Sequence, residues 1–147
     1  MAQTTTATTT SAAVVQVKIA SGSYTSISGS TNSVDTVTIE VTTGSKGTLE
    51  GGEQIIQSGR QVETTVTVNC LYTETTDEAL KTTLASIKAN SVCQVKWFPV
   101  ASGGKYFNTA ENGRILKVKL PAPDAEKGEP LMFSFDVFCG GIETSFT

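Results

Sequence analysis

The stretch QVETTVTVNCLY, residues 61–72, alternates between two kinds of side chain. One side of it is mainly apolar and holds Val62, Thr64, Val66, Val68, Cys70 and Tyr72. The other side is polar and holds Glu63, Thr65, Thr67 and Asn69. Successive side chains of a β-strand point to opposite faces, so this period of two predicts a strand with one buried face and one polar face.

A second alternation precedes the first and predicts its partner strand. In VDTVTIEV, residues 34–41, Val37, Ile39 and Val41 share one side. The polar side continues one residue further and holds Thr36, Thr38, Glu40 and Thr42. Between the two strands lie a glycine-rich loop over 43–53 and the isolated apolar pair Ile55 and Ile56. Residues 34–72 are therefore predicted to form one extended hairpin with a polar, glycine-rich tip.

Further strands are predicted along the chain by the same alternation. Their apolar positions are Val15, Val17 and Ile19, then Cys93, Val95 and Trp97, then Leu116, Val118 and Leu120, then Leu131, Phe133, Phe135, Val137 and Cys139. Asn112-Gly113 is a strong hairpin-turn dipeptide, and a short strand over 142–146 closes the chain. Met132 and Phe138 fall on the other side of their strand, which indicates a strand covered on both faces, as by a partner subunit.

Only one segment has the period of a helix. Thr75 and Glu78 form a capping box, and Leu80, Leu84 and Ile87 recur on one face. Asn90 is the expected C-terminal cap. These residues predict an amphipathic helix over 76–89 that covers a sheet edge or an open end of a sandwich.

Length and composition fit a single β-rich domain. The chain has 147 residues, which suits one domain with one sizeable core. Residues 1–13 are threonine-rich without apolar periodicity and are expected to form a flexible arm, whereas residues 14–147 form the domain. The fold class is therefore predicted as mainly β, a β-sandwich with one flanking α-helix and a long polar-tipped hairpin.

The composition argues against catalysis and against binding to anionic polymers. Histidine is absent, which excludes histidine-based nucleophile pairs and histidine-ligated zinc. A formal net charge of −3 gives no basic patch for nucleic acid or membrane. Cys70, Cys93 and Cys139 lie on apolar sides without metal-ligand spacing, so they are expected to be inert core residues. We therefore expect no enzyme, metal or cofactor, and neither a secretory signal nor membrane anchoring.

The order of these parts resembles the major tail tube protein of a tailed bacteriophage. The likeness is carried by VDTVTIEV, TGSKGTLEGGEQIIQSGR, QVETTVTVNCLY, TDEALKTTLASIKAN and MFSFDVFCGGIETSFT. The resemblance implies homohexameric rings that stack helically, with sheets of all subunits joined into an inter-subunit barrel around a channel. It further implies that DNA passes through the channel transiently and without specific binding. The protein would be assembled in the host cytoplasm and become part of the virion tail. Its expected partners are the tape measure protein, the tail terminator, the baseplate or tip and, in some tails, a sheath protein.

Two sets of residues become candidate assembly sites under this resemblance. The lumen-facing candidates are the polar side of the predicted hairpin, namely Thr36, Thr38, Glu40, Thr65, Thr67 and Asn69. The inter-subunit candidates lie in the connection, namely Lys46, Leu49, Glu50, Glu53, Ile55, Ile56 and Arg60, and the arm before residue 14 is a further one. The alternatives are that the polar side faces outer solvent and that the connection is a mobile surface loop.

Two other kinds of protein share part of this pattern. A monomeric immunoglobulin-like binding or decoration module on a virion or cell surface also has threonine-rich alternating strands. Such a module does not need a long polar-tipped hairpin or a strand that is apolar on both sides. A hydrolase on a β scaffold is disfavoured by the missing histidine.

Overall fold

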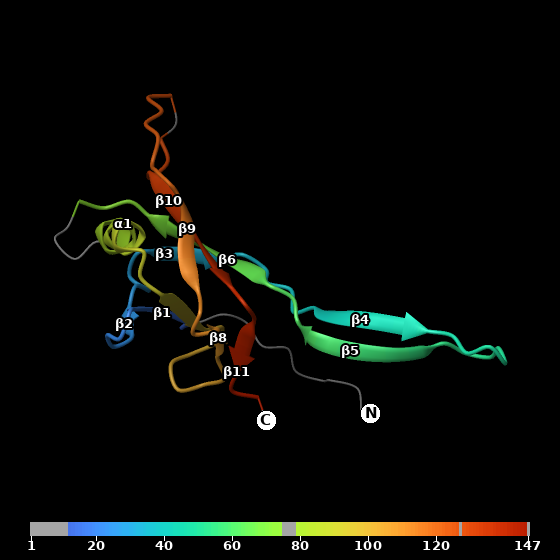
Figure 1. Cartoon of the computed structure of the whole chain (residues 1–147). Coiled ribbons are helices and arrows are strands. Elements are labelled where there is room, and N and C mark those ends of the chain that lie inside the picture. The colour runs from blue at the N-terminus through green and yellow to red at the C-terminus, as the bar shows by residue number, and fades with distance from the viewer. Residues whose placement is uncertain (1–11, 75–78, 127, 147) are drawn as a thin grey trace, which may run out of the picture.

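The computed structural model describes residues 12–74, 79–126 and 128–146 and shows two antiparallel sheets (Figure 1). One has five strands in the order β11 (Ile142–Thr144), β8 (Phe107–Thr109), β7 (Cys93–Phe98), β1 (Val14–Ile19), β2 (Thr25–Ser26). The other has four, in the order β3 (Thr31–Val34), β6 (Thr64–Leu71), β10 (Met132–Cys139), β9 (Arg114–Lys119). A separate ribbon pairs β4 (Val41–Lys46) with β5 (Ile55–Gln61), and α1 spans Ala79–Ala89. The predicted mainly β class with a flanking helix and a long hairpin is confirmed.

The core lies between the two sheets. Val66 and Val68 of β6 and Phe135 of β10 are fully buried, and Val15 and Val17 of β1 approach them from the five-stranded sheet. Each such side chain contributes about 1.5–3 kcal/mol to the free energy of unfolding. The alternation of residues 61–72 therefore predicted the buried positions of β6 correctly.

The strand predicted over 36–42 is wrong. Residues 35–40 belong to no strand, while β3 ends before them at Val34 and β4 begins after them at Val41. The segment is held to its surroundings by bonds at its two ends, from Asp35 N to Thr67 O (3.0 Å) and from Val62 N to Glu40 O (2.9 Å). The period of two was real, but the chain leaves β6 after Asp35. Val34 is the last ladder partner on this side, and residues 64–67 of β6 have no strand beside them there. Conversely, residues 43–46 of the predicted loop over 43–53 belong to β4, and the residues from Ile55 to Gln61 form β5.

Strand β9 departs from the predicted alternation at a bulge. Its ladder with β10 pairs Val118 with Phe135 and Ile115 with Val137, so one residue, Leu116, is skipped. Ile115 is therefore buried, whereas Leu116 is 65% exposed and Leu120 is 63% exposed. The expectation that Leu116 and Leu120 face the core is corrected. Leu116 is the extra residue of the bulge, and Leu120 follows the last residue of β9, Lys119.

Two other predictions near β9 and β10 are also corrected. The dipeptide Asn112-Gly113 makes no hairpin, since β8 before it and β9 after it belong to different sheets. Leu131 precedes the first residue of β10 and is 38% exposed rather than buried.

Helix α1 flanks the four-stranded sheet, packing against its edge strand β9, as predicted. Asn90 caps it with φ 51°, and the bonds Asn90 N to Ile87 O and Ser91 N to Ser86 O (both 3.1 Å) complete a Schellman motif. Ile87 is 37% exposed, because the buried stripe of the helix runs through Leu80, Thr83 and Ser86 and is narrower than the predicted apolar face. The predicted capping box of Thr75 and Glu78 and the arm over 1–11 lie outside the described residues.

Candidate assembly surfaces

The side of the four-stranded sheet that points away from the core is polar. We call it the polar face and define it by Ser33, Asp35, Thr65, Thr67, Asn69, Lys117, Lys119, Ser134 and Asp136. Strand register places Asp136 between Thr67 and Lys117. It likewise places Ser134 between Asn69 and Lys119. Polar side chains thus form continuous rows across three strands.

The groups of the polar face satisfy one another. Thr67 Oγ1 donates a hydrogen bond to Asp136 Oδ1 (2.8 Å). Asn69 Nδ2 donates to Asp35 Oδ1 (2.8 Å) and to Ser33 Oγ (3.1 Å). Two acids, Asp35 and Asp136, and two lysines of β9, Lys117 and Lys119, give the face no net formal charge. The face is therefore neutral overall, and both of its acids already accept hydrogen bonds.

The structure brings half of the predicted lumen residues together. Thr65, Thr67 and Asn69 lie in a row on the polar face. Thr36, Thr38 and Glu40 lie instead on the exposed segment 35–40, outside any strand. The sequence reasoning missed Ser134, Asp136 and the two lysines of β9, although their alternation in β10 and β9 was the signal that could have placed them.

Apolar side chains stand at both ends of the polar face. Leu71 and Met132 are ladder partners at one end and are 36% and 38% exposed. Phe138, at the other end, is 42% exposed. Met132 and Phe138 thus lie outside the core, as their phase indicated, and their cover by a partner subunit stays a prediction.

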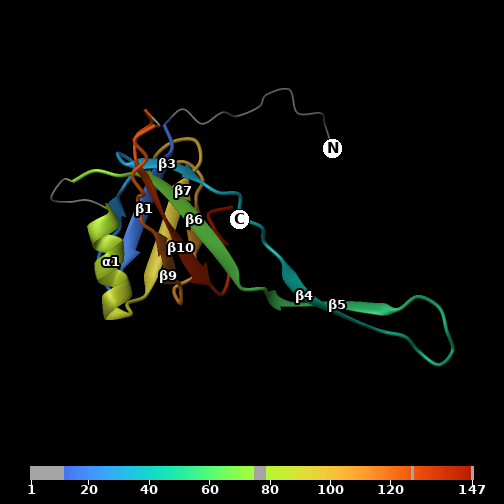
Figure 2. The same ribbon diagram turned by 90° about the horizontal axis from the view of Figure 1, so that it is seen from above.

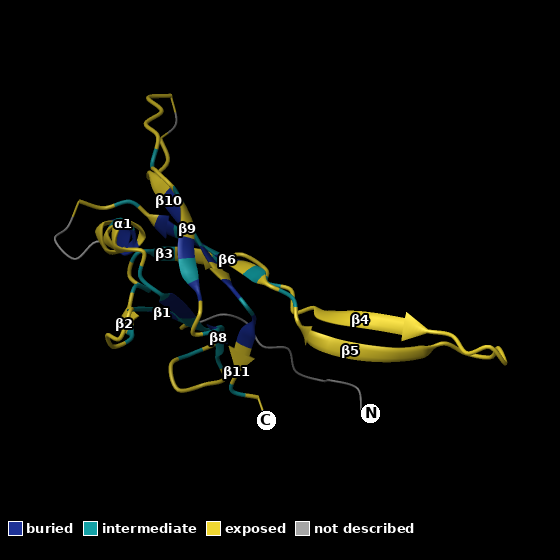
Figure 3. Ribbon diagram, in the orientation of Figure 1, coloured by how far each residue is buried: buried dark blue, intermediate teal, exposed yellow. Residues whose placement is uncertain are grey.

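The ribbon of β4 and β5, which we call the hairpin, extends far from the sandwich (Figures 1 and 2). Every residue from 38 to 61 is exposed, as the yellow colour of Figure 3 shows. The segment nevertheless carries large apolar side chains, with Ile55 57%, Ile56 72% and Leu49 107% exposed. All the predicted inter-subunit residues lie here: Lys46, Leu49, Glu50, Glu53, Ile55, Ile56 and Arg60. An apolar surface of this kind on a projecting ribbon is typical of a protein-contact site.

The base of the hairpin is fixed to the sandwich by one side chain. The amide of Gln61 accepts from Ile142 N (2.9 Å) and donates to Ile142 O (3.4 Å), so it pairs with β11 as a strand residue would. Gly141 leaves room for it, since a Cβ there would lie 2.7 Å from Gln61 Oε1. The Arg60–Glu63 ion pair (3.7 Å) is exposed and contributes little to the free energy of unfolding.

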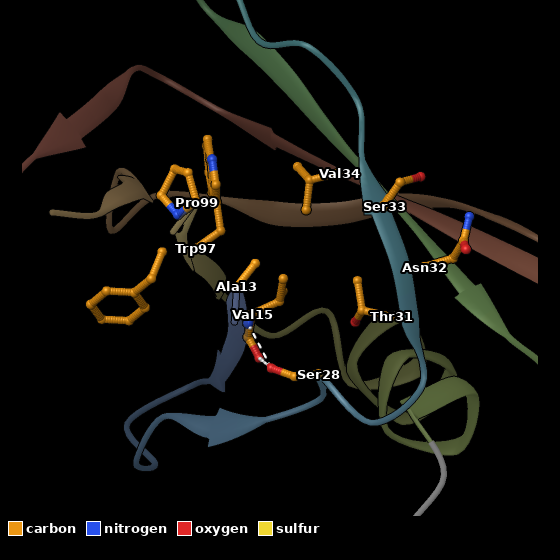
Figure 4. A pocket seen from close by; sticks show the side chains of 10 residues that line it. Ala13, Val15, Ser28, Thr31, Asn32, Ser33, Val34, Trp97 and Pro99 are labelled. Atoms are coloured by element: carbon orange, nitrogen blue, oxygen red, sulfur yellow. Dashed lines mark hydrogen bonds between the residues drawn. The ribbon is translucent and has the colours of Figure 1, made fainter. Parts of the chain in front are cut away.

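A groove opens along one side of the sandwich, between β3 and the strand ends of the five-stranded sheet. It consists of two hollows of ≈370 Å³ and ≈230 Å³ that share Val34 and Trp97 in their walls. Figure 4 shows the larger hollow, where Trp97 and Val34 stand opposite each other. Phe107 and Ile142 line the smaller one. We call this surface the Trp97 groove.

The outward side of the five-stranded sheet carries lysines packed on tyrosines. Lys96 Nζ lies 4.0 Å from the ring centroid of Tyr24 and 4.7 Å from that of Tyr106. Asn108 Nδ2 donates to the Tyr24 hydroxyl (2.9 Å), and burial raises the pKa of Tyr24. The lysine charge is stabilised by its own aromatic neighbours, so this cluster is explained by packing within the sheet.

No described residue group offers catalytic or metal chemistry. Cys70, Cys93 and Cys139 are buried and unbridged, which confirms their assignment to the core. Burial raises the pKa of Cys70 to about 11 and that of Cys93 to about 12, so both are protonated thiols near neutral pH. Within the described ranges, no three His, Cys, Asp or Glu side chains lie close enough to hold a metal ion.

Among the residues that the structure describes, no helix has the length and apolarity needed to cross a membrane.

Sequence comparison finds no match, but structural comparison finds several. No family model and no curated protein matches the chain. A chain in the extended sheath–tube complex of PVC, an extracellular contractile injection system, matches with a TM-score of 0.69 at 15% identity, over 90% of this chain and 88% of that one. A chain in the tube-terminating cap of the anti-feeding prophage matches with a TM-score of 0.69 at 12% identity, over 90% and 88%.

A third match comes from a different kind of particle. A chain in the C6-symmetric tail of an empty gene transfer agent particle matches with a TM-score of 0.62 at 14% identity, over 91% of this chain and 94% of that one. These identities are too low to transfer a function, but each match spans nearly the whole of both chains. The chain has the tail tube protein fold.

Proposed function

We propose that the chain is a structural subunit that polymerises as stacked hexameric rings into the tube of a phage-like tail. The observation that carries this proposal is the hairpin, which is exposed throughout although it bears Ile55, Ile56 and Leu49. A monomeric immunoglobulin-like module has no use for such a surface, whereas a subunit buries it on assembly. The C6 symmetry of the gene transfer agent tail supports six copies per ring.

The polar face is proposed to line the channel. The four-stranded sheet ends in the strands β3 and β9, and edge-to-edge pairing of six copies would close these edges into a barrel. Thr65, Thr67 and Asn69 would then point into the lumen. A neutral face whose polar groups already bond one another gives DNA little to adhere to, which suits a conduit.

The proposed partners follow from the particles that share the fold. One match lies in a sheath–tube complex, a second in a sheath/tube terminator and a third in a baseplate. We expect a tail terminator, a baseplate or tip and a tape measure protein to contact this tube, and a sheath where the tail is contractile. The subunit is then part of the virion tail, assembled in the host cytoplasm.

Electron microscopy of the purified protein tests the proposal. We expect rings with six-fold symmetry or tubes when the protein is concentrated, or when preformed tube ends are added as nuclei. A species that stays monomeric at high concentration with nuclei present would contradict it and favour the decoration module. Double-stranded DNA added to the tubes should show no retention at physiological salt.

A further inference from the structure

The Trp97 groove is open because the chain leaves the four-stranded sheet early. Strand β3 ends at Val34, and the residues that follow it up to 40 pair with no strand. Trp97, Phe107 and Ile142 are therefore left along the wall of an apolar hollow instead of being closed over by a longer β3. Nothing else in the described chain fills the space.

The hairpin projects from the sandwich, whereas the groove is a hollow, and the hairpin cannot reach the groove of its own molecule. Ile55 and Ile56 are at the end of β5 that is furthest from Gln61, about 20 Å of strand away. Because Gln61 is clamped to Ile142, the hairpin points away from its own sandwich (Figures 1 and 2). An apolar projection and an apolar groove on one chain are the two halves of a heterologous contact, in which each copy gives one half and receives the other.

The charges at the two surfaces are complementary. Asp35 is the single charged residue that lines the two hollows. Its Oδ1 accepts a hydrogen bond from Asn69 Nδ2 (2.8 Å), but among the described residues it forms no ion pair. Lys46 is the ladder partner of Ile55 and likewise forms no ion pair among the described residues. A hairpin that enters the groove with Ile55 would bring a lysine toward this carboxylate.

We propose that the hairpin of one copy docks into the Trp97 groove of another copy, with Ile55 beside Trp97 and with Lys46, on the same side of the ribbon, facing Asp35. This inference rests on the proposed function, because it names the surface that receives the hairpin in the tube. Since each copy has one hairpin and one groove, the contact can link copy to copy, either around a ring or from ring to ring, and stacked rings contain both kinds of neighbour.

Cross-linking between two variants, each with one added cysteine, tests the contact directly. Ile55→Cys protein is mixed with Asn32→Cys or Thr36→Cys protein, assembled, and treated with a short bifunctional maleimide. Asn32 and Thr36 are exposed residues that line the hollows, and the native cysteines are buried. We expect a cross-linked dimer in both mixtures. The matched control is Gln16→Cys, on the opposite side of the five-stranded sheet, which should give none.

Charge reversal gives a second readout. Asp35→Lys and Lys46→Asp should each raise the protein concentration needed for assembly by about tenfold or more, and the double variant should recover most of the loss. Glu111→Lys is the control and should leave the concentration unchanged, because Glu111 is an exposed turn residue that lines neither hollow and lies outside the hairpin. Circular dichroism of each variant checks that it is folded.

The outcomes separate this inference from the proposed function. Tubes that cross-link through Gln16→Cys, or through neither groove position, overturn the docking inference and leave the tube function standing. Failure of the double charge variant to recover overturns the Lys46–Asp35 contact. If the unmodified protein forms no tubes, the proposed function fails and this inference fails with it.

Discussion

Strand β10 places two phenylalanines in opposite environments. Phe135 is fully buried between the sheets, whereas Phe138 is 42% exposed at one end of the polar face. Phe135→Ala should lower the free energy of unfolding by about 3–5 kcal/mol, because it leaves a cavity in a packed core. Phe138→Ala should lower it by about 0.5 kcal/mol or less. Denaturant unfolding of unassembled protein measures both, and equal losses would contradict the burial pattern.

The buried thiols make stability depend on alkaline pH. Burial raises the pKa of Cys70 to about 11 and that of Cys93 to about 12 from the ordinary 9.0. The unfolded chain therefore loses these protons first as pH rises, and their contribution to stability is complete below pH 9 and is lost through pH 11 to 12. Unfolding measured at several pH values should show this decline, and Cys93→Ala should show a shallower one. A parallel decline in the variant would contradict the assignment.

At the scale of elements, Gln61 sets the direction of the hairpin. Gln61→Ala removes two hydrogen bonds to Ile142, which contribute about 0.5–1.5 kcal/mol each. We expect the Ile142 amide to exchange with solvent faster and assembly to weaken, while the circular dichroism spectrum is retained. Gln57→Ala, on the same strand and exposed, is the control. Unchanged exchange at Ile142 would show that the side chain does not hold the hairpin.

The sequence predicted elements well where one strand face is buried against a neighbour. Residues 64–71 and 132–139 alternate, and both form long strands of one ladder. It failed where contacts between distant segments decided the outcome. Residues 34–41 alternate as strongly, yet the chain leaves the edge of β6 after Asp35 and forms no ladder up to residue 40. The small polar residues of β4 form a ladder because β5 lies beside them. The sequence does not predict the bulge at Leu116 either, because Leu116 and Val118 alternate regularly with the lysines between and after them.

The same limits apply to the candidate site. Thr65, Thr67 and Asn69 could be placed on one polar face because they share a strand with buried Val66 and Val68. Ser134 and Asp136 alternate with buried Phe133 and Phe135, but local alternation does not say that β10 lies beside β6. Asp35 follows the end of β3 and reaches the face only through its contacts with β6. The groove beside Trp97 depends on where β3 ends, and that is likewise set by pairing between distant segments.

At the scale of the whole molecule, the hairpin should be dispensable for folding and essential for assembly. Gly44 and Gln57 are ladder partners, so residues 45–56 can be replaced by an Asn-Gly turn that keeps their register. All the removed residues are exposed, and the free energy of unfolding should change by about 0.5 kcal/mol or less. Electron microscopy should show no tubes. Normal tubes from this variant would show that the hairpin is not part of the assembly interface.

The assignment of the polar face to the lumen predicts where added charge will hold DNA. In tubes of a Thr65→Lys/Thr67→Lys variant, each ring adds lysines inside the channel, and short double-stranded DNA should be retained at low salt and released as salt rises. Gln16→Lys/Ser26→Lys adds the same charge to paired positions on the other sheet. Both variants should bind DNA, but only DNA in the channel is shielded from a nuclease. Digestion of DNA on the Thr65→Lys/Thr67→Lys tubes as fast as on the control tubes would place the polar face outside the lumen.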